Sequence, residues 1–328
     1  MRSRLIDFLI VSGLVLVGKI QISPLFAEKP LGFPTWVLLG LFIFAVTGGT
    51  TGCGVKREMQ FEVSPQILNA RDATLDELLT IVNGYEGISD LKSSGMKATL
   101  TSGKWESGRQ EEYRSAPGYV LLKRPSLLHL VMQSPVIYKT AIFEAVSGGD
   151  EFSAWLRNTN RVYQGRNSAR ELYADDLPNG IPLRPSHLYE AIIPAGIDLE
   201  NPELRISLEE SADKTAKYYI LSVYQTDAPP LIRTVRRIWI ERSQLVLARV
   251  QSFDEKGSLV GDITYFDMMP VGDFLLPGKI DLVRPGDGYS LALEFTNGSW
   301  TVNSGLGEDS FLLAPRDGVE VVDLKEKP

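Results

Sequence analysis

The segment YSLALEFTNGSW, residues 289–300, has an alternating pattern that favours a half-buried β-strand. One side of this strand is apolar and the opposite side is mostly polar, with members Tyr289, Leu291, Leu293 and Phe295 against Ser290, Ala292, Glu294 and Thr296. The pair Asn297-Gly298 follows directly, and Asn-Gly is the strongest short signal for a tight hairpin. The segment therefore predicts antiparallel pairing in a sheet with one apolar face.

The same period of two recurs along much of the chain. It predicts further strands at 96–100, 119–122, 127–132, 141–146, 152–157, 161–164, 236–241, 245–253, 258–266, 279–284 and 299–303. Turn sequences such as SGGD at 147–150, DEKG at 254–257 and PGDG at 285–288 separate them. About eleven short antiparallel strands with one apolar face must curl or stack to hide that face.

Two segments have a helical period instead. In the first, Thr74 is followed three residues later by Glu77, which is a capping box, and Gly84 is the predicted stop. An apolar stripe follows the cap, formed by Leu75, Leu78, Leu79 and Val82. The second is a short helix at 186–193. Two helices are too few to cover the sheet from outside, so we expect an α+β, mainly β fold: an unclosed antiparallel β-barrel with helices covering its concave face.

Composition excludes several classes of function. The chain has 328 residues, 34 basic and 41 acidic, and its net charge of −7 comes without any basic block that would neutralise a phosphate backbone. We therefore expect no nucleic-acid partner. One cysteine and two histidines leave no Cys/His zinc site, and no internal disulfide can form. We expect neither a metal nor a cofactor.

The N-terminal part is typical of an exported protein. Arg2 and Arg4 precede an apolar run at 5–17, and a second run at 36–46 ends in TGGTTGCG, residues 47–54. Both runs are shorter than the roughly 20 residues that span a bilayer comfortably. The small residues before Cys53 resemble a bacterial lipobox, in which the cysteine is lipidated and becomes the first mature residue, although Thr50 stands where lipoboxes usually carry Leu. The alternative is a two-helix membrane anchor with an unmodified thiol.

These features divide the chain into three parts. Residues 1–52 form the signal or anchor segment, 53–71 a lipidated tether, and 72–328 the half-barrel domain. Whether Cys53 is lipidated or residues 1–52 stay as a membrane anchor, we expect that domain to be tethered to a membrane outside the cytoplasm.

The order of elements resembles the LolA/LolB family of bacterial lipoprotein carriers. The resemblance covers Asp72 to Leu324 and is carried by ELLTIVNGYEGISDLKSSGMKATL at 77–100, GYVLLKRPSLLHLVMQSP at 118–135, GGDEFSAWLRNTNRVYQG at 148–165, IWIERSQLVLARVQSFDEKGSLVGDITYFD at 238–267 and LLPGKIDLVRPGDG at 275–288. It implies a lipid-binding half-barrel whose apolar cavity, lidded by helices, holds the acyl chains of a lipoprotein or lipid during sorting or transfer in the cell envelope. Cys53 aligns the chain with the lipidated receptor type, which faces the periplasm from the outer membrane. LPNGIPL at 177–183 is a candidate for the protruding apolar loop of that receptor.

The cavity lining that we expect comes from the first helix and two strands: Leu78, Leu79, Val82, Leu100, Leu291, Leu293 and Phe295. The alternative for each of these residues is a packed core. Each acyl methylene removed from water contributes about 0.8 kcal/mol, so an apolar cavity is what a lipid needs in order to leave a membrane. A second function class stays open, since fold alone does not settle function: a tethered envelope domain of the same fold that binds a protein partner, such as a signalling regulator or an assembly subunit.

Enzyme chemistry has little support in the sequence. The segment GYSLA, Gly288 to Ala292, matches the esterase pattern G-x-S-x-G except at its last position. The triad partners would be His129 or His187 and Asp267 or Asp281. That nucleophile needs a sharp turn between a strand and a helix, but Ser290 lies within an alternating strand. We expect no enzyme, with a hydrogen-bonded ring for His129 in a strand and a surface position for His187 in the first turn of a helix.

Overall fold

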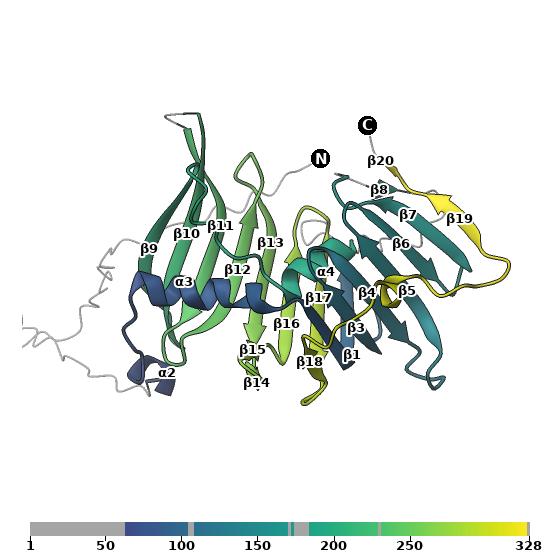
Figure 1. The fold of residues 1–328 in the computed structure, drawn as a ribbon, viewed down its shortest axis with the longest axis horizontal. Helices are drawn as coiled ribbons and strands as arrows, with labels where there is room; N and C mark the ends of the chain where they lie inside the picture. Colours follow the sequence, from purple (N-terminus) through teal and green to yellow (C-terminus); the bar gives the residue numbers. More distant parts are fainter. Residues whose placement is uncertain (1–62, 104–107, 170–171, 174–183, 229–230, 327–328) are drawn as a thin grey trace, which may run out of the picture. The chain divides into compact units, whose positions relative to one another are not determined.

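The computed structural model describes residues 63–103, 108–169, 172–173, 184–228 and 231–326, which lie within one unit, Glu62–Pro328. Strand β17 (Tyr289–Phe295) pairs with β1 on one side and β16 on the other, inside a sheet of sixteen strands (Figure 1). The order along the sheet is β19-β7-β6-β5-β4-β3-β1-β17-β16-β13-β12-β11-β10-β9, with β2 and β18 also pairing with β1. All of these pairs are antiparallel except β19 with β7.

The strands other than β17 have the following bounds: β1 (Asp90–Ser102), β2 (Glu111–Glu112), β3 (Ala116–Lys123), β4 (Leu127–Gln133), β5 (Ala141–Gly148), β6 (Glu151–Leu156), β7 (Arg161–Arg166), β9 (Leu204–Ala212), β10 (Lys217–Ala228), β11 (Leu231–Glu241), β12 (Val246–Phe253), β13 (Leu259–Phe266), β16 (Lys279–Arg284), β18 (Trp300–Val302) and β19 (Glu320–Asp323). Two small sheets pair β14 (Met269–Val271) with β15 (Phe274–Leu276) and β8 (Leu172–Tyr173) with β20 (Lys325–Glu326).

The mainly-β, unclosed antiparallel sheet expected from the sequence is confirmed, because the path ends at β9 and β19, which do not pair with each other. The sheet has more strands than the eleven or so expected. Part of the difference is the β9–β10 hairpin, which the sequence pattern did not predict. The last five residues of β9 are all exposed, so this edge strand shows only a short stretch of apolar alternation.

The helices are α2 (Pro65–Leu68), α3 (Leu75–Asn83) and α4 (Pro185–Ile192), with 3₁₀ turns η1 (Gly84–Gly87) and η3 (Glu308–Phe311). The predicted capping box of α3 is confirmed: the Thr74 amide donates to Glu77 Oε2 at 2.7 Å, and the Glu77 amide donates to Thr74 Oγ1 at 3.3 Å. The helix ends at Asn83, directly before Gly84, as predicted, but Gly84 has right-handed backbone angles because the chain continues into η1. Leu75 departs from the predicted apolar stripe, because it is 41% exposed.

Both α3 and α4 pack on the apolar face of the sheet. Leu78 and Ile192 belong to one buried cluster with inward residues of β1, β3, β4, β10–β13, β16 and β17. In Figure 1, α3 crosses in front of β10–β12, whereas α4 lies beside β16, β17 and β4. The two helices therefore fill the space over different parts of one sheet.

A C-terminal strap, residues 304–324, covers the opposite face of β4–β6, pairs through β19 with the edge of β7, and is drawn in yellow in Figure 1. Its start is fixed by Asp90, whose carboxylate accepts the amides of Ser304 and Gly305 at 2.8 and 2.9 Å. Its end is fixed by β19 and by the Leu324 amide, which donates to the Gln164 carbonyl at 2.7 Å. Beneath the strap, β4 is buried on both faces, since Leu128 to Met132 are all buried.

The predicted signal or anchor segment and most of the predicted tether lie outside the described residues. Of the tether, residues 63–71 are described; they contain α2, and the Arg71 amide donates to the Arg242 carbonyl at 3.0 Å. No helix in the described part of the chain is long and apolar enough to cross a bilayer.

Candidate functional site

An apolar pocket of about 580 Å³ opens on the helix-bearing face of the sheet, over β1, β3–β6 and β17. Its residues are Met96, Ala98, Leu100, Tyr113, Arg114, Ala116, Leu130, Met132, Ile142, Phe143, Leu156, Arg157, Asn158, Leu291 and Leu293. Pockets that hold one small organic ligand typically measure about 300–1,000 Å³. The pocket is therefore large enough for one such ligand.

The strand register brings the floor of the pocket together. Leu100 lies opposite Leu291, and Ala98 lies between Leu293 on β17 and Ala116 on β3. Two alanines side by side leave space that larger side chains would fill in a packed core. Three of the predicted lining residues, Leu100, Leu291 and Leu293, meet in this pocket.

The other four predicted residues lie elsewhere in the same buried cluster. Leu78, Leu79 and Val82 face the sheet from α3, and the Phe295 ring packs against Trp300 with ring centroids 4.3 Å apart. None of the four lines the pocket. Sequence reasoning missed the β3–β6 residues of the wall, although Leu130 and Met132 lie at inward positions of a predicted strand.

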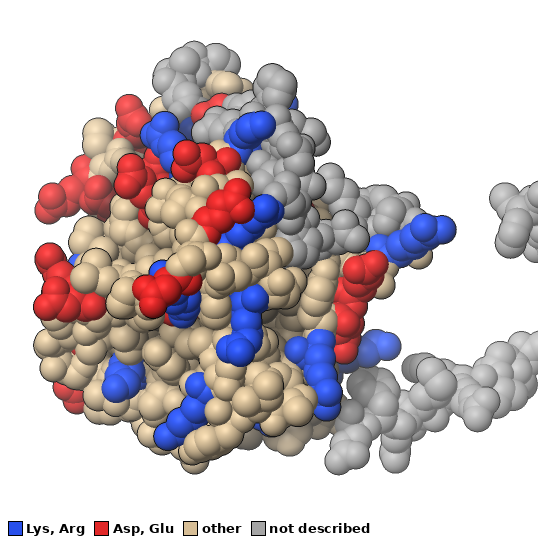
Figure 2. Space-filling view, turned by 90° about the vertical axis from the view of Figure 1, so that its right-hand side faces the viewer, with Lys and Arg blue, Asp and Glu red and all other residues tan. Residues whose placement is uncertain are grey.

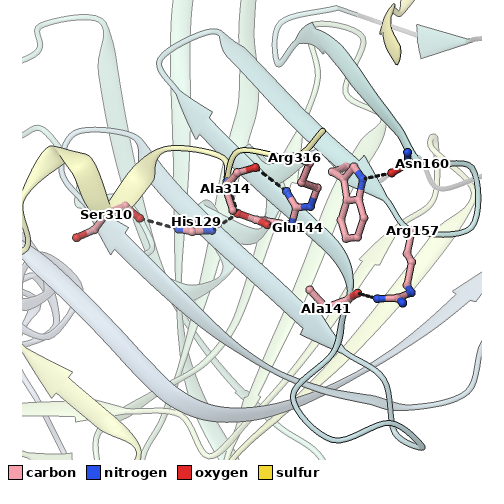
Figure 3. Close-up of polar contacts among 9 residues, drawn as sticks. His129, Ala141, Glu144, Arg157, Asn160, Ser310, Ala314 and Arg316 are labelled. Atoms are coloured by element: carbon pink, nitrogen blue, oxygen red, sulfur yellow. Dashed lines mark hydrogen bonds and ion pairs between the residues drawn. The ribbon is translucent and has the colours of Figure 1, made fainter. Parts of the chain in front are cut away.

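The polar lining residues are Tyr113 and Arg114, just before β3, and Arg157 and Asn158, just after β6. In the antiparallel order β6-β5-β4-β3, these two segments lie at the same edge of the sheet. Arg157 is tied to β5, because its amide donates to the Ile142 carbonyl at 3.0 Å and its Nη1 donates to the Ala141 carbonyl at 3.4 Å (Figure 3). Of the described residues that line the pocket, none is an Asp or a Glu. The two charged side chains are both guanidinium groups.

An exposed apolar loop, residues 134–140, joins β4 to β5 next to this pocket. Its apolar side chains are highly exposed, at 76% for Val136, 58% for Ile137 and 84% for Tyr138. The loop is nevertheless ordered by Ser134, whose hydroxyl accepts the amides of Val136 and Ile137 at 3.2 and 3.0 Å. The predicted protruding loop, 177–183, lies outside the described residues, so the 134–140 loop is the apolar protrusion that the structure describes beside the pocket.

His129 lies on the opposite face, under the C-terminal strap. Its Nε2 contacts Glu144 Oε1 at 3.0 Å, and its Nδ1 contacts the Ser310 carbonyl oxygen at 2.6 Å. Glu144 also accepts a hydrogen bond from the Ala314 amide at 2.9 Å and forms an ion pair with Arg316. The Arg316 guanidinium in turn lies over the Trp155 ring (Figure 3). The hydrogen-bonded strand histidine predicted from the sequence is confirmed, and its partners fix the strap.

His187 differs from its prediction. It lies in the first turn of α4, as expected, but it is only 6% exposed rather than at the surface. Its Nδ1 lies 2.7 Å from the Tyr289 hydroxyl, and Asp287 lies 4.0 Å away. Burial, together with the charges of Arg284 and Arg184, lowers the pKa of His187 to about 2, so the ring is neutral.

Ser290 lies inside β17, as expected, and not on a turn between a strand and a helix. Within the described ranges, no group of three or more His, Cys, Asp or Glu side chains has an arrangement that would hold a metal ion.

No protein-family model and no curated protein sequence matches the chain. Among solved structures, the chain is similar to a DUF1329-family protein from Desulfovibrio piger, with 13% identity, a TM-score of 0.45, and coverage of 72% of this chain and 95% of that one. It is also similar to a LolA-superfamily protein from Nitrosomonas europaea, with 12% identity, a TM-score of 0.43, and coverage of 74% and 99%. A protein domain from Vibrio parahaemolyticus assigned to outer-membrane lipoprotein sorting has 15% identity, a TM-score of 0.44, and coverage of 73% and 97%. The similar structures thus include the family that the sequence resembles, at 12–15% identity and TM-scores below 0.5.

Proposed function

We propose that this chain is a membrane-tethered carrier or receptor that binds the acyl chains of a lipoprotein or lipid and takes part in their sorting or transfer in the cell envelope. The observation that carries the proposal is the apolar pocket of about 580 Å³ on the helix-bearing face. Its Leu, Met, Ile, Phe and Ala side chains offer an acyl chain contacts that water does not. Each buried methylene contributes about 0.8 kcal/mol, so even part of an acyl chain provides a useful affinity.

The exposed 134–140 loop supports transfer to or from a bilayer. Val136, Ile137 and Tyr138 form a contiguous apolar tip, and such a tip beside a pocket mouth is suited to entering the boundary between headgroups and acyl chains. Since β4 and β5 carry both this loop and part of the pocket wall, a bilayer touched by the loop lies next to the pocket.

The N-terminal part completes the proposal. Lipidation of Cys53 after removal of residues 1–52 would anchor the chain at a membrane facing the periplasm, the outer membrane in particular. Mass spectrometry of the mature N-terminus distinguishes a diacylated Cys53 from an unprocessed anchor.

A pocket-filling variant tests acyl binding directly. Ala98→Phe places a ring into the pocket between Leu293 and Ala116, and we expect it to reduce the affinity for a fluorescent fatty-acid probe at least tenfold. Ala292→Phe is the matched control, because Ala292 is also partly buried but belongs to the opposite face of β17. Equal probe affinity in both variants and in the unmodified chain would count against the pocket. Recovery of a stoichiometric protein partner without any bound lipid would instead favour the protein-binding alternative.

A further inference from the structure

The pocket of the proposed function has a charge pattern that sets it apart from the other hollows of similar size. A hollow of about 610 Å³ beside β12 and β13 includes Asp213, Glu241 and Asp267 together with Arg249. One of about 630 Å³ beside the β10–β11 hairpin includes Glu255 together with Arg233, Arg237 and Lys256. The apolar pocket includes Arg114 and Arg157, and none of its described lining residues is acidic.

Both arginines are exposed and stand where the apolar wall ends. Arg114 follows β2, and Arg157 lies in the turn after β6, directly after the wall residue Leu156. The neighbouring Asn158 and Tyr113 add neutral hydrogen-bonding groups at the same end. Lys139 lies on the adjacent 134–140 loop, two residues before Ala141, to which Arg157 is bonded. Figure 2 shows the side of the molecule that lies on the right in Figure 1; Lys and Arg side chains predominate over its lower part, and acidic ones gather at the upper left.

We infer that the pocket takes an acyl lipid with an anionic phosphate headgroup, and that Arg114 and Arg157 bind the phosphate while the acyl chain occupies the apolar part. This inference rests on the proposed function. A guanidinium group donates several hydrogen bonds in a fixed plane that matches phosphate oxygens, and it keeps its charge at any physiological pH. The acylated N-terminus of a lipoprotein carries no phosphate, so the arginines select a phospholipid-type cargo over a lipoprotein.

A matched pair of lipids tests the inference on the purified, delipidated chain. The two probes are 1-oleoyl lysophosphatidic acid and 1-oleoylglycerol, which share one acyl chain and differ in the phosphate. Each competes, below its micelle concentration, with a fluorescent fatty-acid probe. We expect the phosphate lipid to bind about tenfold more tightly at low salt, and the ratio to fall as salt screens the exposed arginines.

Two double variants locate the effect. Arg114→Gln with Arg157→Gln should bring the two affinities close together by weakening the phosphate lipid and leaving 1-oleoylglycerol unchanged. Arg233→Gln with Arg237→Gln, at the 630 Å³ hollow, is the control and should keep the tenfold ratio. Unchanged binding of 1-oleoylglycerol also shows that the first variant is folded.

The outcomes separate the two proposals. If neither lipid displaces the probe, acyl binding itself fails. If both lipids bind equally to the unmodified chain, or if the ratio survives loss of Arg114 and Arg157, only the headgroup inference is overturned. A triacylated lipopeptide that binds as tightly as lysophosphatidic acid would also overturn it and would return the cargo to lipoproteins.

Discussion

Nε2 of His129 on β4 lies 3.0 Å from Oε1 of Glu144 on β5, and the two side chains together hold the C-terminal strap against the sheet. The other ring nitrogen of His129 faces the Ser310 carbonyl at 2.6 Å. Glu144 also forms an ion pair with Arg316 and accepts a hydrogen bond from the Ala314 amide.

The first prediction concerns the acid stability that Glu144 provides. Burial alone would raise the pKa of Glu144, but hydrogen bonds from His129, Arg316 and the Ala314 amide outweigh it and hold the pKa at about 2. The unfolded chain, with a Glu pKa of about 4.3, therefore binds more protons, and stability falls as the pH drops from about 4.5 towards 2. Glu144→Gln should lower the free energy of unfolding at pH 7 by about 2 kcal/mol and flatten this acid slope.

Urea unfolding at a series of pH values measures both effects. Glu151→Gln on the neighbouring β6 is the control. Because Glu151 is exposed, this substitution should leave the pH dependence of the unfolding free energy unchanged. An unaltered acid slope in Glu144→Gln would show that the strap is not held by this carboxylate.

The second prediction uses the neutral His187. Its pKa of about 2 lies below the value of about 6.5 in an unfolded chain, so the unfolded state gains a proton first as the pH falls. Stability is therefore lost below pH 6.5, by up to about 1.4 kcal/mol per pH unit from this group alone. His187→Gln keeps a hydrogen-bonding group beside Tyr289 and should lack this slope between pH 6.5 and 4.5. If the free energy of unfolding falls equally with pH in the variant and in the unmodified chain, the buried, neutral ring is contradicted.

The third prediction compares two buried tyrosines. The Tyr85 hydroxyl donates to the Leu275 carbonyl at 3.1 Å, whereas the Tyr265 hydroxyl has no hydrogen-bond partner among the described residues. Tyr85→Phe should therefore lower the free energy of unfolding by about 1 kcal/mol, and Tyr265→Phe should leave it unchanged or raise it. Chemical denaturation measures the free energy of unfolding of both variants. A larger loss in Tyr265→Phe than in Tyr85→Phe would contradict the prediction.

Local patterns predicted much of the sheet and of α3, because period and capping depend on neighbouring residues. The alternation in 289–295 and the Thr74–Glu77 box are examples. Contacts between distant segments were not predictable in this way. His187 is buried because it meets Tyr289, about a hundred residues later in the chain, and the strap is ordered by a parallel pair, β19 with β7, that no local pattern signals.

The division between core and pocket has the same cause. Leu78 and Leu291 both lie at apolar positions, and alternation or helical period assigns each to the inner face. Which of them faces empty space depends on where α3 and α4 lie over the sheet. The pocket is found over β1, β3–β6 and β17, and that position became visible only with the register of all six strands.

The last prediction separates lipid transfer from lipid binding through the 134–140 loop. Val136→Ser with Ile137→Ser removes two apolar side chains that are 76% and 58% exposed, so the fold should keep its stability. If these side chains enter the bilayer during transfer, their loss should slow the movement of a fluorescent acyl lipid from the protein to vesicles about tenfold, since each partly inserted side chain contributes on the order of 1 kcal/mol. Leu231→Ser with Ile232→Ser, at 62% and 57% exposure on the β10–β11 hairpin, is the matched control and should transfer at the unmodified rate. Stopped-flow fluorescence gives the rate, and equilibrium titration gives the affinity, which should be equal in all three proteins. Equal slowing in both variants would mean that exposed apolar surface acts without regard to position, and the loop would then have no special part in transfer.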